Sequence, residues 1–104
     1  MRSIRRRYTA RRDIVTIWTW YADNAGVEVA DQFLVALESA ISLLAKQPNL
    51  GKAMPGGRPA FQNMRRFPVS DRFRSNVIFY KVSPSALVIV RVTGASRDLA
   101  ALFS

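Results

Sequence analysis

The chain has 104 residues, with 16 Lys and Arg against 7 Asp and Glu, and it contains no His and no Cys. That length suits one domain, so we expect residues 1–104 to form a single domain, and the missing Cys and His exclude disulfides, thiolate chemistry and the commonest general base. The net charge of +9 favours an anionic partner, such as nucleic acid, an acidic membrane surface or an acidic protein.

The first predicted elements are a short strand and a helix. Side chains alternate over residues 3–8, which is typical of a strand, and Thr9 is a suitable N-cap for the helix that follows. Trp20 lies off the apolar face of this helix, which makes it a candidate anchor for a partner protein. Residues that recur at helical spacing form the apolar face: Ile14, Ile17, Trp18 and Tyr21.

A second helix is predicted over residues 27–47, because Asn24 and Gly26 break the first helix and Pro48 ends the second. Its two apolar stripes differ in strength. The stronger stripe, which we expect to face the core, contains Ala30, Phe33, Leu34, Leu37, Ile41 and Leu44. The weaker stripe, which either packs internally or offers a surface to a partner, contains Val29, Ala36, Ala40 and Leu43.

The remaining sequence predicts a loop, three strands and a final helix. Residues 48–60 contain three Pro and three Gly, which indicates a loop, and their PGGRP segment lacks the Lys-Ser/Thr ending of a phosphate-binding loop. Short polar links separate the strands, so we expect hairpins. The predicted elements are strands at 62–69, 73–82 and 86–93 and a short helix at 96–103.

The order of elements is therefore β-αα-βββ, which indicates an α+β fold. We expect the first strand and the later three to share one sheet, with the α-hairpin packed on one face and an Arg-rich face left open. The acids are spread along the chain, so neither a metal site nor a cofactor is expected. The longest apolar run, residues 86–90, is far shorter than the ~20 residues of a membrane span.

The arginines of the predicted sheet have two possible roles. Arg91 lies within an apolar strand, and it either pairs with Asp98 or another carboxylate or contacts a phosphate or an acidic partner. Arg65 and Arg72 are expected to be solvated. We expect Asp98 to cap the final helix.

Several segments of the chain resemble one family. They are RRFPVSDRFRSNVIFYKV (65–82), ALVIVRVTGASRDLAALF (86–103), TARRDIVTIWTWYA, ADQFLVALESAISLLAKQPNLGK and Arg58. Together, and in particular through the spacing of P-x-L-G, R-x-F-P, I-F-Y and R-D-L, these segments resemble the ParE branch of the RelE/ParE toxins of bacterial type II toxin–antitoxin systems. The resemblance covers nearly the whole chain.

The resemblance implies an α-hairpin on a small, strongly twisted antiparallel sheet and a location in the bacterial cytoplasm. It also implies two partners, which are DNA gyrase as the inhibited target and a ParD-like antitoxin whose acidic, flexible C-terminal segment folds on the toxin. For the target we expect contacts from exposed arginines: Arg66, Arg74, Arg91 and Arg97. For the antitoxin we expect contacts from the outer sides of the helices: Trp20, Val29, Ala36 and Leu43.

Two alternatives stay open. RelE-like members of the family cut mRNA on the ribosome, and such a metal-independent endoribonuclease needs a group that moves protons. Here Gly94 stands where the family often has His, the last Tyr is Tyr80 in a predicted strand, and arginines are poor proton acceptors, so an inhibitor is favoured over an enzyme. A plain nucleic-acid-binding module is the other alternative, and it predicts affinity that falls steeply with salt.

Overall fold

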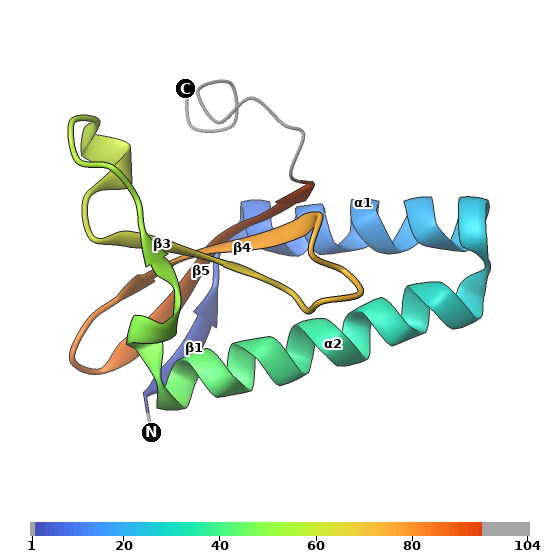
Figure 1. Ribbon diagram of the computed structural model, residues 1–104, viewed down its shortest axis with the longest axis horizontal. Coiled ribbons are helices and arrows are strands. Elements are labelled where there is room, and N and C mark those ends of the chain that lie inside the picture. Colours follow the sequence, from blue (N-terminus) through green and yellow to red (C-terminus); the bar gives the residue numbers. More distant parts are fainter. Residues whose placement is uncertain (1, 95–104) are drawn as a thin grey trace.

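The computed structural model describes residues 2–94, in which an α-hairpin covers one face of a five-stranded sheet (Figure 1). The sheet order is β1-β5-β4-β3-β2. The elements are β1 (Ser3–Arg6), α1 (Tyr8–Ala25), α2 (Val27–Lys46), the 3-10 turn η1 (Pro48–Leu50), β2 (Lys52–Ala53), the 3-10 turn η2 (Pro59–Phe61), β3 (Met64–Pro68), β4 (Asn76–Val82) and β5 (Ala86–Gly94). This arrangement confirms the predicted α+β fold and element order, whereas the predicted final helix at 96–103 lies outside the described residues.

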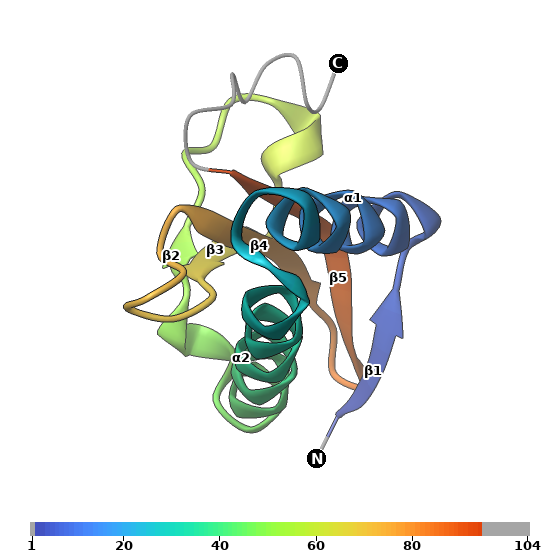
Figure 2. The same ribbon diagram turned by 90° about the vertical axis from the view of Figure 1, so that its right-hand side faces the viewer.

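The sheet is mixed, and this differs from the expected antiparallel sheet. β1 pairs with β5 in parallel, from Ser3 opposite Ala86 to Arg6 opposite Ile89, while β2, β3, β4 and β5 pair antiparallel in succession. The helical hairpin separates β1 from the later strands, so no tight turn forces β1 to run antiparallel to its neighbour. Figure 2 shows β1 at one edge of the sheet.

Two predicted boundaries were wrong for local reasons. β4 begins at Asn76, because residues 72–75 form a turn in which Phe73 is buried in the core although its apolar character had predicted a strand. Thr9 lies inside α1 and does not cap it, because its hydroxyl donates to the carbonyl oxygen of Val90, 3.2 Å away. The predicted loop contains β2, whose two residues are too few to show an alternating pattern.

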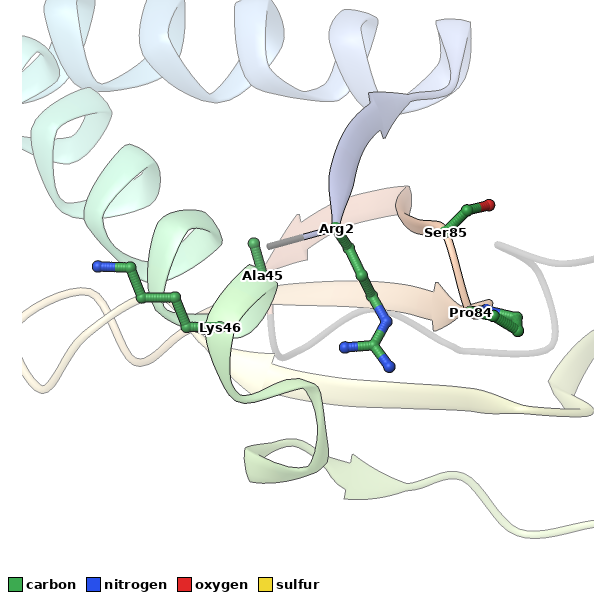
Figure 3. A pocket seen from close by; sticks show the side chains of 5 residues that line it. All are labelled: Arg2, Ala45, Lys46, Pro84 and Ser85. Atoms are coloured by element: carbon green, nitrogen blue, oxygen red, sulfur yellow. The ribbon is translucent and has the colours of Figure 1, made fainter.

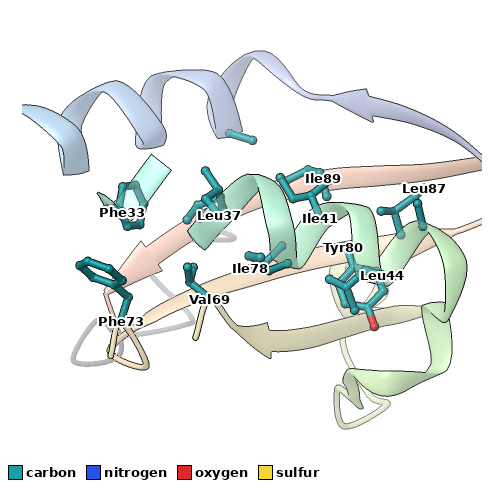
Figure 4. Close-up of a cluster of buried hydrophobic side chains, with 14 residues drawn as sticks. Phe33, Leu37, Ile41, Leu44, Val69, Phe73, Ile78, Tyr80, Leu87 and Ile89 are labelled. Atoms are coloured by element: carbon teal, nitrogen blue, oxygen red, sulfur yellow. The ribbon is translucent and has the colours of Figure 1, made fainter. Parts of the chain in front are cut away.

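The main core lies between α2 and the sheet (Figure 4). The predicted strong stripe of α2 is confirmed, because Phe33, Leu37, Ile41 and Leu44 are at most 1% exposed. Opposite them lie the equally buried side chains of the central strands, which are Ile78, Tyr80, Leu87 and Ile89. This burial supplies the main driving force for folding, at about 25 cal/mol per Å² of apolar surface.

α1 contributes less to the core than its stripe had predicted. Ile14, Ile17 and Tyr21 are partly buried against the core. Trp18 is only half-buried, and its indole Nε1 donates to the Asp31 carboxylate at 3.0 Å, so this side chain links the two helices at the surface.

The far face of the sheet is not fully open. Met54, Met64, Phe79 and Val90 are buried there in a second, smaller apolar cluster. Strand alternation explains the two clusters, because neighbouring side chains of one strand, such as Ile78 and Phe79, point to opposite faces. The segment after β2 therefore covers part of the face that was expected to be open and rich in Arg.

Tyr80 ties the end of α2 to the sheet. Its hydroxyl donates to the Pro48 carbonyl at 2.6 Å and accepts from the Gly51 N–H at 2.9 Å, and burial raises the pKa of this phenol above its usual value. Arg65 supports the same loop, since its guanidinium donates to the Gly51 carbonyl at 2.6 Å. The expectation that Arg65 is solvated was therefore wrong, because backbone carbonyls of the turn bind it.

The close approach of Gly51 to Tyr80 predicts a large effect of adding one methyl group. A Cβ at residue 51 would lie 2.2 Å from the Tyr80 oxygen, so Gly51→Ala should lower the free energy of unfolding by about 1–3 kcal/mol through overpacking. Urea denaturation measures this change. Gly56→Ala is the matched control, because its Cβ would meet nothing within 4 Å. Equal stabilities of the two variants would contradict the prediction.

Candidate functional site

A basic groove lies at the β3 side of the sheet, on the face away from the helices. Phe67 packs against the main core, so alternation along β3 points its neighbours Arg66 and Pro68 toward the opposite face. Arg66 lies opposite Lys52 of β2 and Phe79 of β4. The groove has a volume of about 430 Å³ and is lined by Leu50, Lys52, Arg66, Phe67, Pro68, Arg74 and Val77.

The charge of this basic groove is entirely positive. Lys52, Arg66 and Arg74 are exposed, and no carboxylate lines the groove. Within residues 2–94, no hydrogen bond or ion pair to another side chain neutralises any of the three. Exposed cations around an apolar floor attract an acidic group and give an apolar neighbour of that group a place to pack.

The structure brings together two of the four arginines predicted to bind the target. Arg66 and Arg74 share the basic groove. Sequence analysis missed Lys52 and Leu50, because they lie in a segment whose Pro and Gly content predicted only a loop. Arg97 lies outside the described residues.

Arg91 is held elsewhere, by Asp13 of α1. Its Nε and Nη2 atoms donate to the two carboxylate oxygens at 2.7 and 2.8 Å, and this hydrogen bonding raises the pKa of Arg91 above its usual value. One of the carboxylate oxygens also accepts the N–H of Val92 at 3.1 Å. The prediction that a carboxylate pairs with Arg91 is confirmed, and among the described residues a partner is Asp13, which joins the start of α1 to β5. Asp98, the partner named from the sequence, lies outside the described residues.

Arg72 is exposed, as expected of a solvated charge, but it also has a structural partner. Its guanidinium donates to the side-chain oxygen of Gln32 on α2 and lies 5.1 Å from the centroid of the Phe73 ring. These contacts hold the turn between β3 and β4 against α2. Arg72 therefore stabilises a turn and does not line the basic groove.

An apolar groove runs between α2 and β3. It measures about 350 Å³ and includes Ala36 and Leu43, two of the four residues predicted to bind an antitoxin. Its full lining is Ala36, Ser39, Ala40, Leu43, Phe67, Pro68, Val69, Ser70 and Asp71. The predicted weaker stripe of α2 is therefore only partly available to a partner, because Ala40 is buried whereas Leu43 is 39% exposed.

The other two predicted antitoxin contacts do not line this apolar groove. Trp20 is 58% exposed on α1, where its ring packs edge-on against Tyr21 with centroids 5.4 Å apart. Val29 is partly buried against the main core. Trp20 is therefore available to a partner, and Val29 is available only in part.

The apolar and basic grooves adjoin at β3. Phe67 and Pro68 line both grooves. β2 pairs only with Arg65 and Arg66, so within the described sheet the outer edge of β3 beyond Arg66 carries no strand. A single extended segment can thus contact the apolar groove and the basic groove in succession.

A wider hollow of about 730 Å³ lies where β1, α2 and the β4–β5 hairpin meet (Figure 3). Arg2 and Lys46 line it, but Figure 3 shows the Lys46 side chain pointing away from Arg2. The Arg2 Nε atom donates to the Ser83 carbonyl at 2.9 Å. The two cations of the hollow therefore cannot bind one anion together, and the basic groove is the better candidate site.

The described residues contain no group of three or more His, Cys, Asp or Glu side chains that could hold a metal ion. Neither α1 nor α2 is long and apolar enough to cross a membrane.

The sequence and the structure were compared with known proteins. Residues 4–99 match the family described as the ParE toxin of the type II toxin–antitoxin system parDE. Toxin ParE1 of Mycobacterium tuberculosis is 29% identical over 91 residues, which cover 86% of each chain, and Toxin RelE3 of Caulobacter vibrioides is 33% identical over 92 residues, which cover 88% of this chain and 92% of its own.

Solved structures share the fold at lower identity. A chain of the chromosomal ParDE system of P. aeruginosa is 20% identical with a TM-score of 0.74, and the match covers 92% of this chain and 98% of that one. A chain of the E. coli DinJ-YafQ toxin–antitoxin complex is 17% identical with a TM-score of 0.60, and the match covers 99% and 98% of the two chains.

Proposed function

The chain belongs to the family of ParE toxins of type II toxin–antitoxin systems, and we therefore propose that it inhibits DNA gyrase and that direct binding of an antitoxin neutralises it. We further propose that residues 1–104 act as one toxin domain in the bacterial cytoplasm, where gyrase works. The observation that carries the proposal is the basic groove, whose cations Lys52, Arg66 and Arg74 meet no carboxylate among the residues that line it.

The chemistry of the basic groove favours an inhibitor over a ribonuclease. Removing a proton from an RNA 2′-hydroxyl requires a base within hydrogen-bond reach. The groove lining contains no acid and no Tyr, and the chain has no His. Tyr80 does not substitute, because its hydroxyl is buried and bonded to Pro48 and Gly51, and its pKa is raised. The groove lining thus offers cations that bind anions and, apart from the Lys52 amine, no side chain that transfers protons.

The gyrase proposal is tested with the purified protein. We expect it to inhibit ATP-dependent supercoiling by gyrase and to accumulate cleaved DNA bound to the enzyme. The alternative is a RelE-type ribonuclease, for which translating ribosomes would show codon-positioned mRNA cuts in a toeprinting assay. Cuts on ribosomes together with unaffected gyrase would replace the proposal with that alternative.

The two adjoining grooves support an antitoxin with an acidic segment. Some of the similar structures are toxin–antitoxin complexes, which supports an antitoxin partner for this chain. We propose that apolar side chains of that partner occupy the apolar groove at Ala36 and Leu43 and that its acidic side chains then reach Arg66 and Arg74. Trp20 is proposed as a further contact on α1, and Val29 as a minor one because the core already covers part of it.

The proposed antitoxin contact predicts that Leu43→Asp weakens binding of the cognate antitoxin by about 10- to 100-fold, because a buried charge without a partner costs more than 1 kcal/mol. Val35→Asp is the matched control, since Val35 is an aliphatic residue of the same helix, is 68% exposed and does not line the groove. Surface plasmon resonance gives both dissociation constants. Equal losses for the two variants would place the antitoxin elsewhere.

A further inference from the structure

A second basic surface lies far from both grooves, at the opposite edge of the sheet. Residues 2–12 contain six Arg and no Asp or Glu. Arg5, Arg7, Arg11 and Arg12 are exposed, and we call these four residues the N-terminal basic surface. They lie on β1 and the first turns of α1, whereas the basic groove is on the β3 side of the sheet (Figure 2).

Arg5 and Arg7 of this surface point away from the helices. Arg6 pairs with Glu38 of α2, so its side chain faces the helices. Alternation along the extended backbone then points Arg5 and Arg7 toward the opposite side. On α1, the Arg12 guanidinium lies 5.9 Å from the centroid of the Tyr8 ring, which is itself 72% exposed.

No carboxylate within residues 2–94 neutralises this surface. The two ion pairs of the described residues use Arg6 and Arg91, not the four exposed arginines. The first turn of α1 also contains no acid. Four like charges within residues 5–12 repel one another in the folded state, and no ion pair with an acid of residues 2–94 offsets that cost. An external anion would offset it.

We propose that the N-terminal basic surface binds the phosphate backbone of nucleic acid. Interfaces with nucleic acid are polar and much more positively charged than interfaces between proteins, and a surface of four Arg without a paired acid among the described residues fits the first kind. The planar guanidinium group of Arg matches the geometry of phosphate oxygens. The Tyr8 ring beside Arg12 offers a face on which an unpaired base can stack.

This inference goes beyond gyrase inhibition and does not depend on it, because it concerns the toxin and nucleic acid alone. Its test is therefore run without gyrase or antitoxin. Fluorescence anisotropy measures the binding of a labelled 20-base-pair DNA duplex and of a labelled 20-nucleotide single strand over a range of salt concentrations. The duplex reports backbone contacts alone, and the single strand adds stacking on Tyr8.

The test variant is Arg5→Gln/Arg7→Gln/Arg11→Gln, and its control, Lys46→Gln/Arg58→Gln/Lys81→Gln, loses the same charge elsewhere. For the duplex, three lost phosphate contacts should reduce the slope of log K against log[salt] by about 2 to 3 and the affinity at low salt by at least about 10-fold. The control variant should change neither the salt slope nor the affinity at low salt by more than about twofold. Circular dichroism verifies that each variant is folded, and any unfolded variant is replaced by the single substitution Arg5→Gln or Lys46→Gln.

Three results would overturn the proposal. The first is a wild-type protein that binds neither oligonucleotide at low salt. The second is a control variant that loses as much affinity as the test variant, which would indicate attraction by net charge alone. In the third case, a variant neutralised at Lys52, Arg66 and Arg74 would lose the salt slope while the test variant keeps it, which would place nucleic acid in the basic groove.

Discussion

Replacing both Arg66 and Arg74 by Gln is expected to reduce gyrase inhibition by about 100-fold while leaving the fold intact. Both side chains are exposed in the basic groove and make no contact that holds the described structure together. Arginines at the centre of a protein interface contribute more than 1 kcal/mol each, and two losses of about 1.4 kcal/mol amount to that factor.

The concentration of toxin that halves gyrase supercoiling measures this effect. Lys46→Gln/Arg58→Gln removes the same charge outside the basic groove, so it separates a local contact from general attraction. We expect the control to shift that concentration by no more than about threefold. If the groove variant inhibits as well as wild type, gyrase binds another surface and the groove serves the antitoxin alone.

Asp13→Ala is expected to lower the free energy of unfolding by about 2–4 kcal/mol. The Asp13 carboxylate accepts two hydrogen bonds from Arg91 and one from the Val92 N–H, and the side chains of Asp13 and Arg91 are 15% and 23% exposed. Removing one partner of a buried ion pair costs about 3–5 kcal/mol, and partial exposure lowers that cost. The Arg7 N–H and the Thr9 hydroxyl also bond to carbonyls of β5, so part of the contact between the start of α1 and β5 should remain in this variant.

A double-mutant cycle with Asp13→Ala, Arg91→Met and the combined variant, measured by urea denaturation, isolates the interaction. The combined variant should be more stable than Asp13→Ala alone, because it removes the charge that the carboxylate had neutralised. Purely additive losses would show that the pair does not hold α1 to β5. The cycle also separates stability from target binding, since Arg91 was expected at the target surface and the structure places it against Asp13.

The parts of the fold that sequence alone predicts are those with a local period. The stripe of Phe33, Leu37, Ile41 and Leu44 identified α2 and its buried face, because burial on one side of a helix imposes that spacing. The strands β1, β3, β4 and β5 were recognisable from alternating or continuous apolar residues between turns, whereas β2 was not. Arg66 and Arg74 were expected on the face of the sheet away from the helices, and both line the basic groove.

The parts that sequence could not predict are relations between distant residues. Asp13 is 78 residues from Arg91 in the sequence. An acid in the first turns of a helix is already favoured by the helix dipole, so nothing in the sequence indicated that Asp13 pairs with Arg91. Alternation indicates which face of the sheet a side chain occupies but not the direction of the neighbouring strand. The sequence therefore did not indicate that β1 pairs with β5 in parallel. Lys52 was missed because a two-residue strand has no period.

The most direct test of the central claim is a gyrase DNA-cleavage assay with purified toxin, relaxed plasmid DNA and ATP. We predict that cleaved DNA bound to gyrase accumulates with increasing toxin and that prior addition of the cognate antitoxin abolishes it. The variant Arg66→Gln/Arg74→Gln should require about 100-fold more protein for the same effect. Unchanged supercoiling and no cleaved DNA at a large excess of folded toxin would contradict the assignment of gyrase as the target.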